Sequence, residues 1–376
     1  MAVYLDNAAT TKPCRKAVEA INEALTFNYG NPSSLHRMGL NAQLTVDSAR
    51  KSVADALGCD ASCIYFTSGA TESNNLAVRG AASCYGKRKR RIIVSSVEHA
   101  SVAETMNELE SYGFEIVRVR PGAGGKFNPA DFVNAANENT CLISMMLVNN
   151  ETGHILPVKE VFTVLKRRYP DIVTHCDCVQ GFMKIPVKAS ALNADMISLS
   201  GHKIHAAKGV GALYIRKGIR VKPLVSGGKQ EKGIRSGTES VPLIAGFGAA
   251  VKQLTPTIGE RFEYVKGLRS FLLEKLSGID GVTLNSPADG SPYVINISAA
   301  GRRSEIMLHY LEQEEIYVSS GSACSKGAQS GVLAEFGVNQ KDADSALRIS
   351  MTADTTEEEL EKFVLVLNEG IRKIKT

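Results

Sequence analysis

Between residues 50 and 215 the chain repeats one pattern: a short run of apolar and β-branched residues, followed by a longer stretch with the spacing of an amphipathic helix. The apolar runs cover residues 63–67, 91–95, 141–146, 172–177, 195–200 and 210–215. Strands that are apolar on both faces and are separated by helices are typical of a mainly parallel sheet with helices packed on both sides. The pattern therefore predicts an α/β fold whose large domain is built on such a sheet.

A second unit follows this repeating pattern. A chain of 376 residues is too long for one ordinary core, so two domains are expected. We expect residues 15–255 to form the large domain, and residues 1–14 and 256–376 to form a smaller α+β domain.

The smaller domain has its own predicted elements. The sequence predicts a helix that ends at Leu276, and strands at residues 293–297, 316–319 and 346–351. A final amphipathic helix begins with a predicted capping box from Thr355 to Glu358, and its apolar face is predicted to comprise Leu360, Val364, Leu367 and Ile371.

Composition and charge exclude several classes of protein. Charged residues make up 22% of the chain and hydrophobic residues 44%, which favours a packed globular fold over a disordered one. No apolar run approaches the ~18 residues of a membrane span, and the first residues do not resemble a signal peptide. The basic cluster at residues 87–91 contains no aromatic residue, which favours a solvated loop. We therefore expect a cytoplasmic protein that binds neither membranes nor nucleic acid directly.

The cysteines point to a reactive thiol rather than to disulfides or a metal. The eight cysteines form no CxxC pair, and two of them alternate along a strand with His175 and Asp177, which makes a poor zinc cage. Cys324 differs from the rest, because residues 319–327 contain no apolar side chain larger than alanine and are expected to form an accessible surface loop. We expect no metal, and we expect a nucleophilic cysteine in a loop that spans residues 319–331.

Five predicted strands end in polar residues. Because ligands bind at the carboxyl ends of strands in α/β proteins, these residues should form one site. The residues are Ala70 and Thr71 in a small-residue turn, His99, Asn150, Asp177, and the group Ser200, His202 and Lys203.

Each of these residues alone has a simpler interpretation. Asp177 and the turn before Thr71 could cap helices, His99 could be structural, and Asn150 could belong to a turn. Their shared position favours a joint role. A turn that holds phosphate, a carboxylate that pairs with a ring cation, an imidazole that stacks on the ring, and a lysine that forms a Schiff base are the parts of a pyridoxal-phosphate site.

The chain resembles the pyridoxal-phosphate-dependent cysteine desulfurases of the NifS/IscS type over essentially its whole length. These enzymes belong to the class V aminotransferases of fold-type I. The resemblance rests on eight motifs in order: residues 4–11 (YLDNAATT), 30–36 (GNPSSLH), 67–75 (TSGATESNN), 97–99 (VEH), 148–151 (VNNE), 200–203 (SGHK), 235–238 (RSGT) and 320–324 (SGSAC).

The resemblance implies a role for each site residue. Lys203 would carry the cofactor, Asp177 would pair with its ring nitrogen, His99 would stack on the ring, and Gln180 would bind its phenolic oxygen. The cofactor's phosphate would be held by Ala70, Thr71, Ser200 and His202, and by Thr238 from the partner in a homodimer. Arg348 and Asn150 would bind the substrate carboxylate, and Cys324 would be the nucleophile.

The implied reaction converts L-cysteine to L-alanine and leaves a persulfide on Cys324 for a sulfur-acceptor protein. That acceptor would be an iron–sulfur scaffold or a tRNA-thiolation enzyme. The chain departs from the family pattern in a shorter segment from Cys324 to Val332, in Cys178, and in residues 204–209. Two alternatives remain open: a selenocysteine lyase or other fold-type I enzyme, and a sulfur or metal carrier without catalysis.

Overall fold

The computed structural model describes residues 2–299, 301–320 and 331–374. The strands are β1 (Val3–Tyr4), β2 (Ile64–Thr67), β3 (Arg91–Ser95), β4 (Glu115–Val119), β5 (Thr140–Met146), β6 (Val173–Asp177), β7 (Met196–Ser200), β8 (Gly211–Ile215), β9 (Val282–Leu284), β10 (Val294–Ala299), β11 (Ile316–Tyr317) and β12 (Ala346–Ser350). The α-helices are α1 (Arg15–Thr26), α2 (Arg37–Leu57), α3 (Ala70–Tyr85), α4 (Ala100–Ser111), α5 (Pro129–Ala135), α6 (Val158–Arg168), α7 (Ala189–Leu192), α8 (Val241–Leu254), α9 (Ile258–Ser277), α10 (Ser304–Gln313), α11 (Gly331–Glu335), α12 (Gln340–Asp344) and α13 (Glu357–Lys373).

The larger sheet has seven strands in the order β2-β8-β7-β6-β5-β3-β4. Strands β4, β3, β5, β6 and β7 are parallel to one another, whereas β8 is antiparallel to both β7 and β2. A short connection of residues 201–210 joins β7 to β8, and such a connection does not allow the helical crossover that a parallel pair needs. The predicted α/β fold with a mainly parallel sheet is confirmed.

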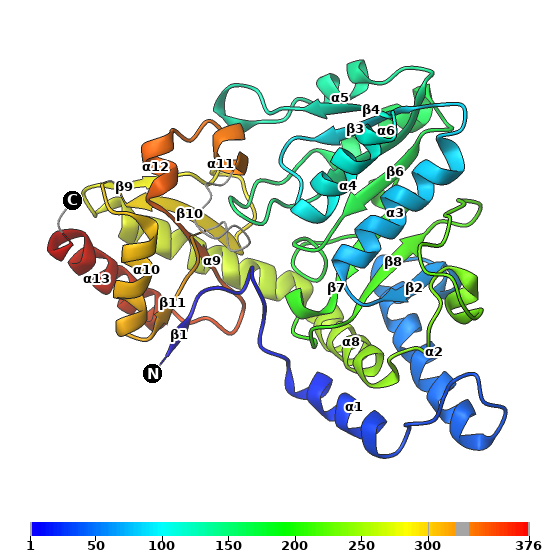
Figure 1. Ribbon diagram of the computed structural model, residues 1–376. Helices are drawn as coiled ribbons and strands as arrows, with labels where there is room; N and C mark the ends of the chain where they lie inside the picture. The colour runs from blue at the N-terminus through cyan, green and yellow to red at the C-terminus, as the bar shows by residue number, and fades with distance from the viewer. Residues whose placement is uncertain (1, 300, 321–330, 375–376) are drawn as a thin grey trace.

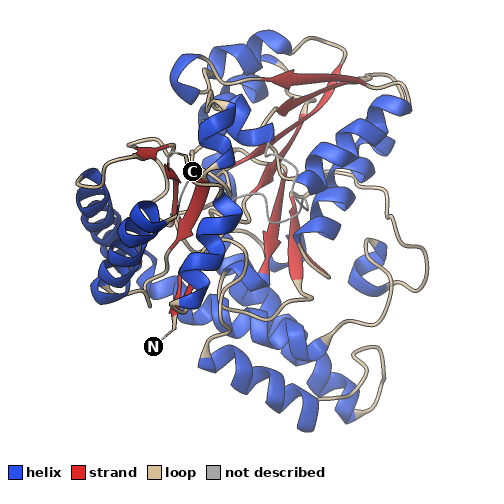
Figure 2. Ribbon diagram, turned by 60° about the vertical axis from the view of Figure 1, so that its left-hand side comes forward, coloured by secondary structure: helices blue, strands red, loops and turns tan. Residues whose placement is uncertain are grey.

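Helices cover both faces of this sheet (Figures 1 and 2). Successive residues of a strand point to opposite faces, so Ile92 and Val94 of β3 pack in one buried cluster with α3 and α4, whereas Ile93 packs in another with α2, α6 and α8. Strands that are buried on both faces give the continuous apolar runs seen in the sequence.

A smaller antiparallel sheet, in the order β12-β10-β9, packs with α9, α10 and α13. Its buried cluster also contains Val3, Leu5 and Ala8 from the start of the chain. This composition supports a proposed division into a large domain of residues 15–255 and a small domain formed by both chain ends.

The predicted capping box of the last helix was displaced by one residue. The N-cap of α13 is Thr356, whose side chain pairs with the backbone of Glu359, and the Glu359 side chain returns the bond. Thr355 is engaged elsewhere, because its hydroxyl accepts a hydrogen bond from the backbone N–H of Thr352.

The first residues of the chain connect the two sheets. Strand β1 pairs in parallel with β11, and Asp6 forms a β-bridge with Ser350 at the end of β12. A few residues later, the backbone N–H of Thr11 donates to the carbonyl of His202 at 2.8 Å. The segment therefore carries residues 6–11 from the small sheet to the carboxyl end of β7, as the dark blue trace in Figure 1 shows.

The predicted basic cluster lies against the protein's own side chains and backbone. Arg91 pairs with Glu115, Lys89 with Asp171, and the Arg90 guanidinium lies over the ring of Phe114. Of the helices in the described ranges, none combines the length and apolar character that crossing a membrane would require.

Candidate active site

The polar residues predicted from the strand ends gather at one edge of the large sheet. Strand β2 leads through Gly69 into α3, and β8 passes directly beside this turn. A Cβ on Gly211 would lie 2.8 Å from the Gly69 backbone and 2.6 Å from the Leu199 carbonyl, so only glycine allows this approach. The sixteen-residue helix α3 has no side-chain cap, and its first N–H groups face the turn.

A chain of hydrogen bonds links Asp177 to His99. The Asn74 amide donates to Asp177 Oδ2 and to the Ser101 hydroxyl, both at 2.8 Å. That hydroxyl lies 2.9 Å from His99 Nδ1, and the backbone N–H of Val179 donates to the other oxygen of Asp177 at 2.9 Å. The carboxylate and the imidazole are thus held in fixed orientations at the ends of β6 and β3.

Glu98 lies beneath this chain and adds no charge to it. Its carboxyl accepts a hydrogen bond from the Met146 backbone at 2.7 Å and another from the Ser95 hydroxyl. Burial, with a smaller contribution from the nearby Asp177, raises the pKa of Glu98 to about 8 although its two hydrogen bonds oppose the shift. Glu98 is therefore protonated at neutral pH.

Lys203 lies against the N-terminal segment. Its ammonium donates to the backbone carbonyls of Ala8 and Ala9, each at 2.6 Å. Gln180 donates to the same Ala8 carbonyl at 2.9 Å, so one carbonyl joins the two side chains.

His202 is neutral at this position. Burial, with smaller contributions from Lys203, Lys208 and Lys184, lowers its pKa to about 4. Its Nδ1 lies 3.3 Å from the Thr10 hydroxyl. A neutral imidazole retains one N–H, which can donate to an anion.

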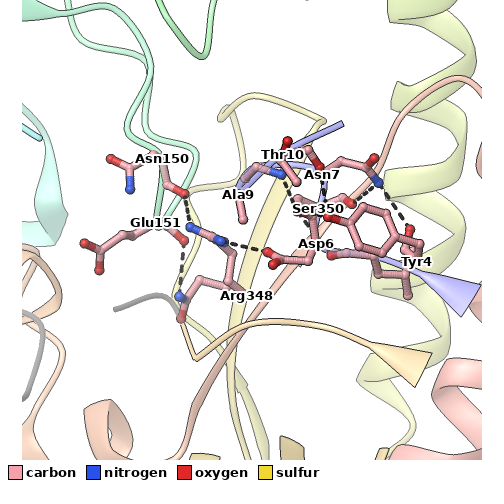
Figure 3. A network of polar contacts seen from close by, with 12 residues as sticks. Tyr4, Asp6, Asn7, Ala9, Thr10, Asn150, Glu151, Arg348 and Ser350 are labelled. Carbon is pink, nitrogen blue, oxygen red and sulfur yellow. Dashed lines mark hydrogen bonds and ion pairs between the residues drawn. The ribbon is translucent and has the colours of Figure 1, made fainter. Parts of the chain in front are cut away.

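Arg348, in β12 of the small sheet, borders the site from the small-domain side and is deeply buried, with 3% of its surface exposed. Its guanidinium donates to Asp6 Oδ1 at 2.8 Å and to the Asn150 carbonyl at 3.1 Å (Figure 3). Within the described part of the chain, its Nε has no hydrogen-bond partner. The guanidinium therefore keeps a donor available for a further acceptor.

The donor set fits pyridoxal phosphate. The Ser200 hydroxyl is buried and, among the described residues, has no hydrogen-bond partner, as expected of a group that a phosphate would satisfy. The uncapped start of α3 and the neutral His202 supply further donors to an anion. Asp177 supplies a fixed carboxylate for a ring cation, and Lys203 supplies an amine at the same edge of the sheet.

The structure joins most of the predicted site residues. It links Asp177 to His99, Gln180 to Lys203 through Ala8, and Arg348 to Asn150. Ala70 is half-buried and Thr71 exposed at the start of α3, while Thr238 is exposed in the segment before α8 and outside these hydrogen-bonded groups.

Cys324 lies outside the described residues, as does most of the predicted loop of residues 319–331. The residue at the start of that loop is described: Ser319 exchanges two backbone hydrogen bonds with Arg348. The chain thus enters this segment from a residue that is paired with the backbone of Arg348 in β12.

Sequence reasoning missed several residues that hold the site in shape. Asn74 and Ser101 orient Asp177 and His99, and each lies within the first turns of a helix that starts at the site. The signal that could have found them is a polar residue in the first turns of a helix that follows a predicted strand. Asp6 and the Ala8 carbonyl have no comparable signal, because their role depends on the path of the N-terminal segment.

Comparisons with known proteins agree with this geometry. The family model of the class-V aminotransferases matches residues 3–363. A curated "NifS/IcsS protein homolog" from Lactobacillus delbrueckii subsp. bulgaricus is 40% identical over 98% of this chain and 96% of its own length. "Cysteine desulfurase IscS" from Methanosarcina thermophila is 39% identical over 100% of this chain and 93% of its own length.

The solved structures include one named "NIFS-LIKE PROTEIN" that is 37% identical to this chain, with a TM-score of 0.94 and full coverage of both chains. Fold, site and sequence therefore agree over the whole length. The chain belongs to the class-V aminotransferase family and, within it, to the pyridoxal-phosphate-dependent cysteine desulfurases of the NifS/IscS type.

Proposed function

We propose that this enzyme removes sulfur from L-cysteine, releases L-alanine, and holds the sulfur as a persulfide on Cys324. The observation that carries the proposal is the convergence of a fixed carboxylate, an amine and a buried guanidinium at one edge of the sheet. When bound, the cofactor supplies an electron sink for the electron pair at the substrate's Cα.

Arg348 binds the substrate carboxylate in this proposal. A guanidinium matches a carboxylate in shape and charge, and the Nε, which has no partner among the described residues, supports a further acceptor at this group. Asp6 and the Asn150 carbonyl hold the guanidinium in place from the other side. The substrate's Cα is thereby directed toward Lys203.

Lys203 Nζ takes the proton from the substrate's Cα and later returns a proton to the product. The carbonyls of Ala8 and Ala9 orient this nitrogen. Asp177 would stabilise positive charge on the ring nitrogen of the bound cofactor, and Asn74 and Val179 hold its carboxylate in a fixed orientation. His99 would contact the ring and carry protons within the site.

The Cys324 thiolate attacks the substrate's sulfur. A sulfur–sulfur bond forms, the bond between the substrate's Cβ and Sγ breaks, and Cβ gains a proton to give alanine. No external oxidant or reductant is consumed in this step. The backbone pairing of Ser319 with Arg348 supports the proposal, because the chain enters the cysteine segment next to the residue proposed to bind the substrate's carboxylate.

We propose that two copies of the chain form a homodimer. Several large apolar side chains on α1, the start of α2 and their connection are exposed, among them Leu25, Phe27, Tyr29, Leu35 and Leu44. An exposed apolar area of this kind is typical of a protein interface. Thr238 is exposed as well, which suits a residue that contributes to the partner's phosphate site.

The persulfide is proposed to pass to an acceptor protein for iron–sulfur cluster assembly or tRNA thiolation in the cytoplasm. The described cysteines are all free, which suits a reducing compartment. The acceptor class can be identified by capturing the enzyme from its own cell extract. Persulfidated enzyme is compared with a Cys324→Ala protein, and a partner that only the persulfidated enzyme retains is the acceptor.

The central proposal is tested by incubating the purified enzyme with L-cysteine. We expect alanine to be released, with stoichiometric sulfide once a thiol reductant is added, and alkylation after one turnover to locate the persulfide on Cys324. A persulfide mainly on any of the other seven cysteines, or alanine production without cofactor, would contradict the proposal.

A further inference from the structure

A second lysine, Lys184, lies buried close to the site and takes no part in the proposed reaction. It follows Met183, whose backbone has a φ of 59°, in the turn after β6. Only 5% of Lys184 is exposed, and it lines a small cavity together with Lys203, His205 and Tyr293. A lysine at such a depth is rare unless a partner compensates its charge.

The surroundings of Lys184 make its positive charge costly. Burial, with smaller contributions from Lys203 and Arg348, lowers its pKa to about 7. Among the described residues, the other titratable or charged groups that face it are cationic or neutral: His202 and His205 on the Lys203 segment, Arg261 on α9, and Tyr293, whose ring centroid lies 5.8 Å from the ammonium.

The ammonium of Lys184 donates to Gln180 Oε1 at 2.6 Å. A lysine ammonium has only donors, whereas an amide has a donor side and an acceptor side. Gln180 must therefore turn its oxygen toward Lys184 and its NH₂ group away from it. That NH₂ group donates to the Ala8 carbonyl, which also receives Lys203.

We propose that Lys184 is a positioning residue of the cofactor site, which holds the Gln180 amide so that its NH₂ group faces the cofactor's phenolic oxygen. The proposal rests on the proposed function and on the role that the family resemblance implies for Gln180, which is to bind that oxygen. Lys184 touches neither substrate nor cofactor in it. It fixes which end of an amide does so, and where it is protonated it adds a positive charge behind that amide.

The proposal has a spectroscopic consequence. A donor and a cation near the phenolic oxygen stabilise negative charge there, and so favour release of the proton from the nitrogen that joins Lys203 to the cofactor. Replacing Lys184 by methionine removes the cation and lets the amide rotate. The nitrogen that joins Lys203 to the cofactor should then keep its proton up to a higher pH. The midpoint of the visible spectral transition should rise by about one pH unit.

The experiment compares the wild type with Lys184→Met, Lys184→Arg and the control Lys188→Met, each reconstituted with pyridoxal phosphate. Lys188 lies in the same segment, and its ammonium bonds to the Ala56 carbonyl of α2 at 2.8 Å. Visible absorbance is titrated against pH without substrate. We expect the midpoint to rise in Lys184→Met, to return toward the wild-type value in Lys184→Arg, and to stay unchanged in Lys188→Met.

A Lys184→Met protein with the wild-type midpoint would overturn the proposal, as would an equal shift in Lys188→Met. Borohydride reduction and peptide mapping of each sample separate this failure from failure of the proposed function, because the latter predicts the cofactor on Lys203. If Lys184→Met does not fold, Lys184→Gln serves instead. Its amide can donate or accept, so an upward shift of smaller size is expected, and no shift would again refute the role of Lys184.

Discussion

The guanidinium of Arg348 donates to the carboxylate of Asp6 at 2.8 Å, although the two residues are 342 positions apart in the chain. Arg348 is buried and Asp6 is partly exposed, with 3% and 21% of the side chains accessible. In the proposed function, the substrate's carboxylate and the Asp6 carboxylate would therefore interact with the same cation. This relationship leads to the first prediction.

Asp6→Asn should strengthen cysteine binding and weaken the fold. Loss of the Asp6 charge leaves more of the positive potential of Arg348 for the substrate, so KM should fall several-fold. The free energy of unfolding should fall by about 1–3 kcal/mol, because a buried cation loses its charged partner. Steady-state kinetics and urea unfolding measure the two effects, and a rise in KM would show that Asp6 mainly orients Arg348.

Asp177→Asn should retain the cofactor but lose most turnover. A neutral amide cannot stabilise the charge on the ring nitrogen, and loss of one buried charged hydrogen bond costs roughly 2–4 kcal/mol, or about 30- to 1000-fold in rate. The measurement is kcat at saturating cysteine, with cofactor content determined in the same sample. Unchanged turnover would mean that Asp177 only caps the turn at Val179.

Cys324→Ala should separate cysteine binding from sulfur removal. The variant should still bind cysteine and change the visible spectrum, but it should release no catalytic alanine and form no persulfide. Cys324→Ser should behave in the same way, since a hydroxyl is a far weaker nucleophile toward sulfur.

Cys178→Ala is the matched control for that experiment. Its sulfur is fully buried, 3.4 Å from the sulfur of Cys176. We expect altered stability with sulfur transfer intact, and a loss of persulfide on Cys324 in this variant would point to a second sulfur carrier.

Stability should decrease below neutral pH, in part through His154. Its ring stacks on Phe336 with centroids 3.8 Å apart, and its Nδ1 lies 2.8 Å from the Thr152 hydroxyl. Burial lowers the pKa of His154 from 6.5 to about 4, although Asp289 opposes the shift. Because the pKa is lower in the folded state, the contribution is complete above pH 6.5 and is lost as the pH falls toward 4.

Between pH 7 and pH 5 this contribution should fall by about 1–2 kcal/mol. His154→Asn should be less stable than the wild type at pH 7 but should lose less stability on acidification. Urea unfolding at both pH values tests this, with the exposed His309→Asn as control. Equal pH dependence in His154→Asn and the wild type would contradict the assignment.

The sequence was most informative where the chain is buried on both sides. The central strands form continuous apolar runs, and the six strands predicted for the large domain are all present within a few residues of their predicted ends. Strand β4 was missed because it lies at the sheet edge, where Glu115 and Arg118 are exposed and break the apolar run. The polar residues at strand ends followed from the rule that parallel strands present their carboxyl ends together.

Contacts between distant segments could not be predicted in the same way. The positions of Asp6 and of the Ala8 carbonyl depend on the pairing of β1 with β11, which are two-residue strands with no distinctive pattern. The displaced cap has a similar cause. Thr355 and Thr356 both satisfy the capping pattern, and only the turn at Thr352 decides between them.

The path of the N-terminal segment also determines when the enzyme becomes competent during its synthesis. Residues 3–11 leave the ribosome before the large sheet does, yet their partners β11 and Ser350 are made after it. The large sheet can fold earlier, since its strands end at Ile215. Until Ser350 has emerged, the carbonyls of Ala8 and Ala9 beside Lys203 are anchored only from the Thr11 side, so a nascent or C-terminally truncated chain holds a folded sheet with an incomplete catalytic centre.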